Sequence, residues 1–416
     1  MPKDSIFARL KRAVSFEAVS SNETRDIIYD AAADMISEAE NNSLCGDLWE
    51  IFYAIALVED ENPICRTYER VPMSPGSSFE IVSHDIWAEH KIIAAVKQLV
   101  ENDATYSNLK LLSHYAPTRG ECARQARQAM EDVMGLAGNL AAAESPEDMM
   151  RFAGEFCSLH GSGAFALNHA FSWNSREKRL VPLSDLDPRP LNSLIGYDAQ
   201  KKELLANTRS FLDGNPSNNV LLYGDSGTGK SSSVRALLNE PDFVRCGLRM
   251  IELKHGQFAD INDVIGTVRR RNYRFVIFMD DLSFEEFEVE YKHLKALIEG
   301  GLERKPENIV VYATSNRRNV IREVWSDRAA SIDDVHGWDT MQEKHSLADR
   351  FGVTIWYPSV GKDEYISMVK SIAAEMGLPM QDDALAATAL RWELEKGGFT
   401  GRTARQFVHY MLRREA

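Results

Sequence analysis

The spacing of apolar residues divides the chain into two parts of different character. Through residues 1 to about 170, apolar side chains recur at helical spacing, as in 85–100 and 121–140. From about residue 191 the pattern changes to short apolar runs separated by stretches with helical spacing. These runs predict buried strands at 219–223, 248–253, 275–279, 309–313 and 353–357. Alternating strands and helices are typical of an α/β fold with a parallel, doubly wound sheet.

The predicted domains follow these changes of pattern. We expect a mostly helical N-terminal domain over 1–180 and an α/β core over 181–360, with a proline-rich link at 181–192 between them. Three further segments with helical spacing predict a small C-terminal lid over 361–416, and they are 363–376, 382–395 and 402–414. The length of 416 residues suits two or three domains.

Charge is distributed unevenly along the chain. The net charge is −14, from 48 basic and 62 acidic side chains, and residues 1–190 hold 18 of the basic and 29 of the acidic ones. Because contact with nucleic acid needs clustered positive charge, this acidic part is a poor candidate for it. It could instead face a basic partner, or simply keep the chain in solution.

Membrane, secretory and disulfide signals are weak in this sequence. No apolar run reaches the roughly 18 residues of a membrane span, and residues 1–20 lack the apolar core of a secretory signal. The cysteines form no C-x-x-C pair, and they stand at 45, 65, 122, 157 and 246. We therefore expect reduced thiols, a cytoplasmic location and no membrane contact.

A glycine-rich loop lies between a predicted strand and a predicted helix. It reads Gly224-Asp225-Ser226-Gly227-Thr228-Gly229-Lys230-Ser231 and matches G-x-x-x-x-G-K-[ST]. A strand, a loop and a helix in this order direct backbone N–H groups and a helix N-terminus at one point, which suits phosphate groups. The loop and Ser232 therefore predict a nucleotide site, in which Lys230 contacts the phosphates and the Ser231 hydroxyl binds Mg²⁺.

Two further buried strands end in polar residues. The run 275–279 leads into Asp280 and Asp281, and the run 310–315 leads into Asn316. Ligands bind at the carboxyl edge of open α/β sheets. We expect Asp280 to hold Mg²⁺, Asp281 to activate a water molecule, and Asn316 to align that water or contact the γ-phosphate. Glu285 and Glu286 are reserve candidates for the water-activating role.

Arginines near the end of the chain are candidates for phosphate contacts. Arg350 lies just before the strand at 353–357, where it could stabilise the transferring phosphoryl group, from the same or a neighbouring subunit. Arg402 and Arg405 lie in the first turn of the last predicted helix, where positive charge opposes the helix dipole. A role beyond local stability is therefore indicated, and either arginine could report the γ-phosphate.

Together these motifs resemble the AAA+ ATPases, over residues 191–414. The resemblance implies an ATPase that uses ATP and Mg²⁺, a strand order of 5-1-4-3-2, and Ile195 and Gly196 against the adenine. The stretches 221–233, 280–286, 312–318 and 401–407 are also similar to a bacterial family of AAA+-like ATP-binding proteins of unknown function. That closer resemblance covers the chain from about residue 150 and implies no agreed substrate.

Several functions remain compatible with these motifs. The first is an ATP-driven machine, expected to be a homo-oligomer when active, whose acidic N-terminal domain selects an unknown protein client. The second is a nucleotide-dependent binding switch with little hydrolysis, which the short side chain of Asp281 favours. A small-molecule kinase is disfavoured by Asn316 and the helical lid.

A nucleic-acid ATPase, like a helicase loader or a transposition helper, is a further alternative. It would rest on the basic runs 269–274 and 317–318, because arginine and tyrosine side chains can hold phosphates and stack on bases. The nearly neutral charge of residues 191–416 favours solvated loops instead.

Overall fold

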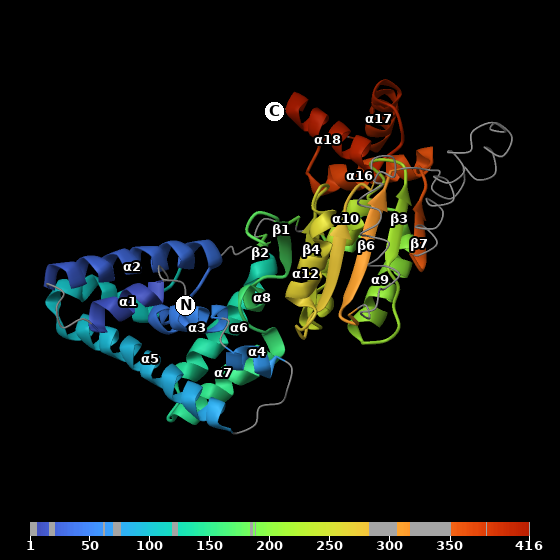
Figure 1. The fold of residues 1–416 in the computed structure, drawn as a ribbon. Coiled ribbons are helices and arrows are strands. Elements are labelled where there is room, and N and C mark those ends of the chain that lie inside the picture. The colour runs from blue at the N-terminus through green and yellow to red at the C-terminus, as the bar shows by residue number, and fades with distance from the viewer. Residues whose placement is uncertain are drawn as a thin grey trace. The chain divides into compact units, whose positions relative to one another are not determined.

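The chain forms two compact units, Met1–Asn168 and His169–Ala416 (Figure 1). The computed structural model describes residues 6–15, 21–60, 63–69, 76–118, 124–183, 186–187, 189–282, 306–316, 351–379 and 381–415.

The first unit is helical and is organised around α3 (Leu48–Glu59). Nearly every side chain of α3 is buried, as its almost uninterrupted apolar sequence predicts. Asp47 caps this helix, because its carboxylate accepts hydrogen bonds from the backbone N–H groups of Trp49 and Glu50. The other helices of the unit are α1 (Ile6–Ser15), α2 (Ser21–Asn42), α4 (Pro63–Tyr68), α5 (Ser77–Asn102), η1 (Ala104–His114), α6 (Arg124–Ala141), α7 (Pro146–His160) and α8 (Ala164–Leu167).

The second unit is built on a seven-stranded sheet in the order β2-β1-β4-β5-β6-β3-β7. The strands are β1 (Ala170–Asn174), β2 (Arg179–Pro182), β3 (Val220–Gly224), β4 (Leu248–Leu253), β5 (Arg274–Met279), β6 (Ile309–Ser315) and β7 (Val353–Tyr357). All neighbouring strands are parallel except β1 and β2. The predicted α/β class with a mostly parallel sheet is therefore confirmed. Counted along the chain from β3, the strands β7, β3, β6, β5 and β4 lie side by side in the order 5-1-4-3-2.

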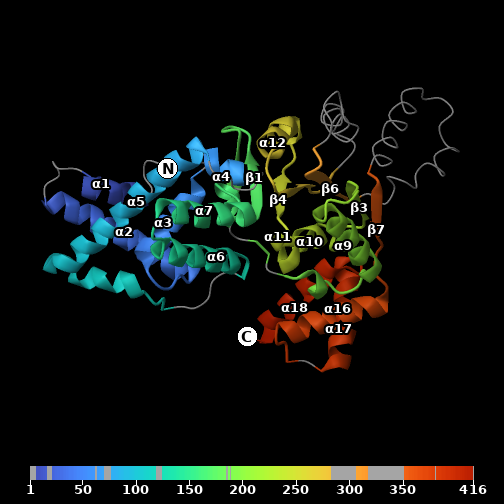
Figure 2. The same ribbon diagram turned by 90° about the horizontal axis from the view of Figure 1, so that it is seen from below.

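Helices cover both faces of this sheet. Figure 2 shows α9, α10 and α11 on one face and α12 on the other. Because both faces are covered, all of β6 and all but the first residue of β5 are buried, and residues 275–279 and 309–313 are continuous apolar runs rather than alternating ones. The bounds of these helices are α9 (Asp198–Leu212), α10 (Lys230–Arg235), α11 (Pro241–Arg245) and α12 (Ile261–Val268), with short 3-10 turns at η2 (Leu191–Ser193), η3 (Ala236–Asn239) and η4 (Phe258–Asp260).

The last three helices share an apolar core of their own. They are α16 (Lys362–Glu375), α17 (Asp382–Lys396) and α18 (Gly401–Glu415), within one or two residues of the predicted segments. Tyr365 and Val369 of α16 pack with Phe407 and Val408 of α18, and all four side chains are fully buried. These helices gather beyond the end of the sheet at which β3 leads into the glycine loop (Figure 1).

The structure departs from the predicted boundary at residue 180. Strands β1 and β2 were expected to belong to the helical part or the proline-rich link, yet they extend the sheet. β1 pairs with β4 in parallel, from Ala170 opposite Met250 to Ser172 opposite Glu252. The division between the units consequently falls at residues 168 and 169. Both strands are short, so neither gives the long apolar run that marks the central strands.

Two sequence expectations concern the chain as a whole. No helix in the described ranges is long and apolar enough to cross a membrane. Cys45, Cys65, Cys157 and Cys246 form no disulfide, while Cys122 lies outside the described residues.

Candidate nucleotide-binding site

The glycine-rich loop follows β3 and turns sharply at Gly224. The φ angle is +138° at Gly224, +82° at Gly227 and +96° at Gly229, values that L side chains rarely adopt. Gly224 is also crowded, because a Cβ placed there would lie 2.0 Å from the carbonyl oxygen of Tyr357. Glycine at this position therefore lets β3 pass beside β7 and lead into the loop.

Replacing Gly224 with alanine is expected to lower the free energy of unfolding by roughly 2–4 kcal/mol, from backbone strain and from the overlap with Tyr357. Urea denaturation of the full chain measures the loss. Gly256→Ala is the matched control, because Gly256 has a φ of +82° but nothing lies within 4 Å of an added Cβ. Its expected loss is about 1 kcal/mol. Equal losses in the two variants would contradict a contribution from the contact with Tyr357.

Lys230 is buried under the loop and is 4% exposed. Its Nζ donates to the carbonyl oxygens of Gly224 (2.9 Å) and Asp225 (2.7 Å) and to Oδ1 of Asn316 (3.1 Å). Burial lowers the pKa of Lys230 to about 8, although nearby carboxylates oppose the shift. A buried ammonium group whose hydrogen-bond acceptors are all neutral gains most from an anionic ligand.

Asp280, directly after β5, connects the loop to the sheet. Its Oδ1 accepts hydrogen bonds from Ser231 Oγ (2.5 Å) and Thr314 Oγ1 (2.6 Å). Its Oδ2 accepts one from Arg235 Nη2 (2.9 Å). Hydroxyl and carboxylate oxygens of this kind are the ligands that Mg²⁺ prefers. The structure thus brings together Ser231 and Asp280, the two residues predicted to bind the metal.

Asp281 has left-handed backbone geometry, with a φ of +57°. Its backbone N–H donates to Thr314 Oγ1 (2.9 Å), and its carboxylate accepts a hydrogen bond from Nδ2 of Asn316. Since Asn316 also accepts from Lys230, a chain of hydrogen bonds runs from the lysine to Asp281. Hydrogen bonds of Asp281 with Thr314 and Asn316 therefore hold the ends of β5 and β6 together.

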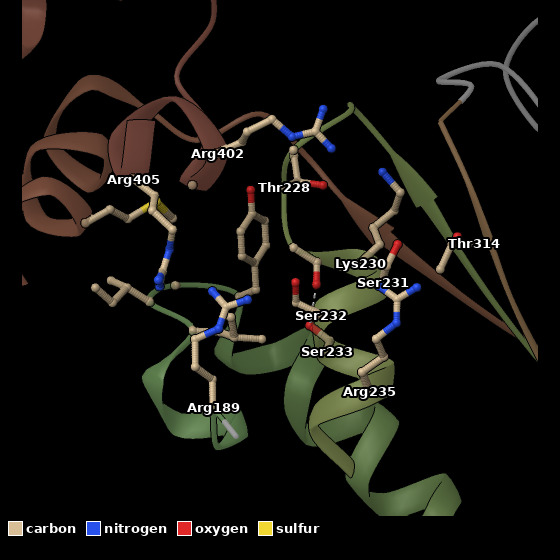
Figure 3. Close-up of a pocket in the computed structure, with 18 of the residues that line it drawn as sticks. Arg189, Thr228, Lys230, Ser231, Ser232, Ser233, Arg235, Thr314, Arg402 and Arg405 are labelled. Atoms are coloured by element: carbon tan, nitrogen blue, oxygen red, sulfur yellow. Dashed lines mark hydrogen bonds between the residues drawn. The ribbon is translucent and has the colours of Figure 1, made fainter. Parts of the chain in front are cut away.

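The first turn of α18 lies against the glycine loop. The backbone N–H of Arg402 donates to the carbonyl oxygen of Gly227 (3.3 Å), and Nη1 of Arg402 donates to Ser226 Oγ (3.3 Å). Arg402 and Arg405 both extend from this helix toward the site (Figure 3). Of the two predicted arginines, Arg402 is the one that contacts the loop.

These elements enclose a cavity of about 410 Å³. Most of the predicted site residues line it, and they are Ile195, Gly196, Gly227, Thr228, Gly229, Lys230, Ser231, Ser232, Asp280, Asp281, Asn316, Arg402 and Arg405. Gly224, Asp225 and Ser226 are not among the lining residues. These loop residues contact other parts of the protein instead. Gly224 packs on Tyr357, and the Asp225 carboxylate accepts a hydrogen bond from Ser359.

Other lining residues were missed by sequence reasoning. Three of them carry charge, namely Arg189, Lys201 and Arg235, and Figure 3 draws both arginines among the side chains that line the site. Among the missed residues, Thr314 could have been found from the sequence, because it is a polar residue in a buried strand, two positions before the predicted Asn316. The positions of the charged residues depend on tertiary contacts, so no local pattern marks them.

The oxygens of Ser231 and Asp280 suit a metal ion whose other ligands come from the nucleotide and from water. Among the described residues there is no group of three or more His, Cys, Asp or Glu side chains that could hold an ion alone. Mg²⁺ in nucleotide sites takes one or two protein oxygens and completes its shell with phosphates and water. The oxygens of Ser231 and Asp280 suit that division.

Several predicted residues lie outside the described ranges. They are Glu285, Glu286, Arg317, Arg318 and Arg350. Their roles stay predictions.

The strand, the glycine loop and the helix that follows define a P-loop α/β protein. Residues 166–415 match the model of the family DUF815, described as a protein of unknown function. Because the match covers more than half of the chain, the protein belongs to this family. The predicted resemblance to a family of unknown function is confirmed. The sequence matches none of the curated proteins with which it was compared.

Solved structures of Thermotoga maritima RuvB, described as a Holliday junction branch migration motor, are similar to this chain. One is 18% identical with a TM-score of 0.38, and the similarity covers 53% of this chain and 63% of that chain. A variant of RuvB is 19% identical with the same TM-score, over 53% of this chain and 64% of its own. This chain thus spans less than two thirds of the length of these structures.

Proposed function

We propose that the protein is a Mg²⁺-dependent ATPase of the AAA+ type that cleaves the β–γ phosphoanhydride of ATP. The proposal is carried by the buried Lys230, which has only neutral hydrogen-bond acceptors, in one cavity with Asp280 and Arg402. Such a cavity offers cationic donors to phosphate oxygens and carboxylates to a divalent cation.

Each side of the cavity has a role in this proposal. Lys230 exchanges the loop carbonyls for phosphate oxygens, and the loop N–H groups bind the same phosphates. Ser231 and Asp280 hold Mg²⁺, which when bound neutralises charge on the phosphates. Asp281 orients the attacking water and accepts its proton, with Asn316 beside it.

The remaining lining residues suit the base and the γ-phosphate. Ile195 and Gly196 pack against adenine, together with Met368 and Ile372 of α16, which line the same cavity. Arg402 reaches the γ-phosphate from α18, whose first turn already contacts the loop. Helices α16 to α18 then act as a lid that moves with the nucleotide. The 5-1-4-3-2 order of the strands supports the AAA+ assignment.

A nucleotide-dependent switch with little hydrolysis is a second candidate. The contact that favours it is the hydrogen bond from Asn316 to the Asp281 carboxylate, because an occupied carboxylate is less free to activate water. The short side chain of Asp281 acts in the same direction.

For the partner, we propose a protein client bound by the helical first unit and a homo-oligomeric active form in the cytoplasm. The nucleic-acid alternative is weakened by two arginines of the basic run 269–274, although Arg269 and Arg270 of the same run are exposed. Arg271 is buried, and the Arg274 guanidinium lies 5.6 Å from the ring centre of Phe211. Side chains engaged in this way are not a free phosphate-binding surface.

Steady-state ATP hydrolysis with Mg²⁺, over a hundredfold range of protein concentration, tests this function. Specific activity is expected to rise with concentration, because Arg350 of a neighbouring subunit would complete the site.

Arg350→Ala is expected to lower turnover by about 100-fold or more and to be rescued in mixtures with an Asp281 variant. Unchanged hydrolysis in Arg350→Ala contradicts the arginine-finger role. Tight ATP binding without turnover at any concentration supports the switch.

ATP binding is expected to take up a proton above pH 8. The pKa of Lys230 is about 8 in the free protein, and phosphates beside Nζ raise it, so binding protonates the lysine between the two values. Affinity should be flat well below pH 8 and fall by up to about tenfold per pH unit above it. Calorimetry at about pH 8.5 in two buffers of different ionisation enthalpy measures the uptake, and equal heats would contradict it.

A further inference from the structure

Arg235, the last residue of α10, lies between two carboxylates at the ends of neighbouring strands. Its Nη2 is 2.9 Å from Asp280 Oδ2 and 2.8 Å from Glu252 Oε1. Glu252 belongs to β4, which pairs directly with β5, the strand that leads into Asp280. The Arg235 guanidinium also lies over the ring of Phe278, 5.3 Å from its centre. One nitrogen therefore bridges both carboxylates at the wall of the nucleotide cavity.

This bridge concerns the same carboxylate that is expected to hold Mg²⁺. Asp280 Oδ1 accepts from Ser231, and its Oδ2 is occupied by Arg235. The guanidinium carries a permanent positive charge. A cation at this place repels a divalent ion that approaches Asp280 and takes up one of its oxygens. Glu252 offers the guanidinium another partner within hydrogen-bonding distance.

We propose that Arg235 competes with Mg²⁺ for Asp280, and that Glu252 limits this competition by holding the guanidinium when the metal binds. The inference rests on the proposed function of the site. Arg235 then pairs with both carboxylates in the metal-free state and with Glu252 alone in the metal-bound state. Arg235 and Glu252 are positioning residues, because they act on the metal site through Asp280.

A purely structural role of Arg235 predicts a different effect on nucleotide affinity. If Arg235 only fastened α10 to the sheet, its loss would weaken nucleotide binding with and without Mg²⁺ alike. Competition instead changes the Mg²⁺ dependence and leaves binding without metal unchanged. The Mg²⁺ concentration that gives half of the metal-dependent gain in nucleotide affinity separates the two roles.

The experiment titrates Mg²⁺ into the full chain with a fluorescent ATP analogue, with binding in EDTA as the reference. Arg235→Gln and Arg235→Met are both expected to lower the half-maximal Mg²⁺ concentration about fivefold, the size of a partly exposed ion pair. The Met variant keeps an apolar stem against Phe278. Glu252→Gln is expected to raise that concentration about threefold. Arg245→Gln, which removes an exposed arginine of α11, should leave it unchanged.

The double variant shows whether Glu252 acts through Arg235. In the Arg235→Gln background, Glu252→Gln is expected to change the half-maximal Mg²⁺ concentration less than about twofold. An unchanged or higher Mg²⁺ requirement in both Arg235 variants, with normal binding in EDTA, overturns the inference and leaves the proposed function standing. A parent chain that binds no nucleotide with or without Mg²⁺ overturns the proposed function, and the inference with it.

Discussion

Replacing Lys230 with alanine is expected to weaken ATP binding by at least about 100-fold. Hydrogen bonds between charged groups contribute about 1.5–3 kcal/mol each, and two lost contacts to phosphate oxygens account for that change. The side chain is almost fully buried, so water cannot readily replace it. Equilibrium titration with a fluorescent ATP analogue measures the loss.

The same substitution is expected to leave the fold intact. The lowered pKa of Lys230 shows that the folded protein holds its charge at a disadvantage, so losing that charge offsets the loss of its hydrogen bonds to the loop. Thermal unfolding without nucleotide should therefore change little. Lys202→Ala, an exposed position on α9, is the control for both measurements. ATP binding by Lys230→Ala at the parental level would mean that the cavity is not a phosphate site.

The loop and the central strands could be predicted because their signals are local. Eight consecutive residues, from Gly224 to Ser231, contain the whole phosphate-binding pattern, and burial on both faces makes the central strands continuous apolar runs. The C-terminal edge of a parallel sheet then gathers the residues that follow each strand. Asp280 and Asn316 were predicted in this way, and both line the cavity.

The partners of these residues could not be predicted in the same way. Arg235 lies in α10 and Glu252 in β4, and only the packing of the helix on the sheet brings both to Asp280. Local sequence reports which residues share a strand or a helix face, but not which side chains of different elements meet. β1 was missed for a related reason, since its pairing with β4 is a long-range contact.

Replacing Asp281 with asparagine is expected to keep ATP binding within about threefold and to lower turnover by at least about 100-fold, the usual contribution of a general base. Asparagine suits the position because, like aspartate, it tolerates the left-handed backbone that Asp281 adopts at a φ of +57°. Its side-chain oxygen can also still accept the hydrogen bond from Asn316. The substitution therefore removes the negative charge and the basicity with little change of shape. Alanine is also expected to stop turnover, but it adds backbone strain of about 1–2 kcal/mol.

Single-turnover hydrolysis, with the protein in saturating excess over ATP, separates this effect from binding. Asp213→Asn, at the exposed end of α9, controls for the loss of one negative charge. Normal turnover in Asp281→Asn would assign water activation to another carboxylate, and Glu285→Gln and Glu286→Gln would then be the variants to measure. Slow turnover in the parent, unchanged by Asp281→Asn, would instead favour the switch.

The variant Asn316→Ala tests whether Asp281 is restrained by its hydrogen bond, because Asn316 donates to Asp281 and accepts from Lys230. If that hydrogen bond restrains the base, removing Asn316 should raise hydrolysis, whereas a role in aligning water predicts a fall.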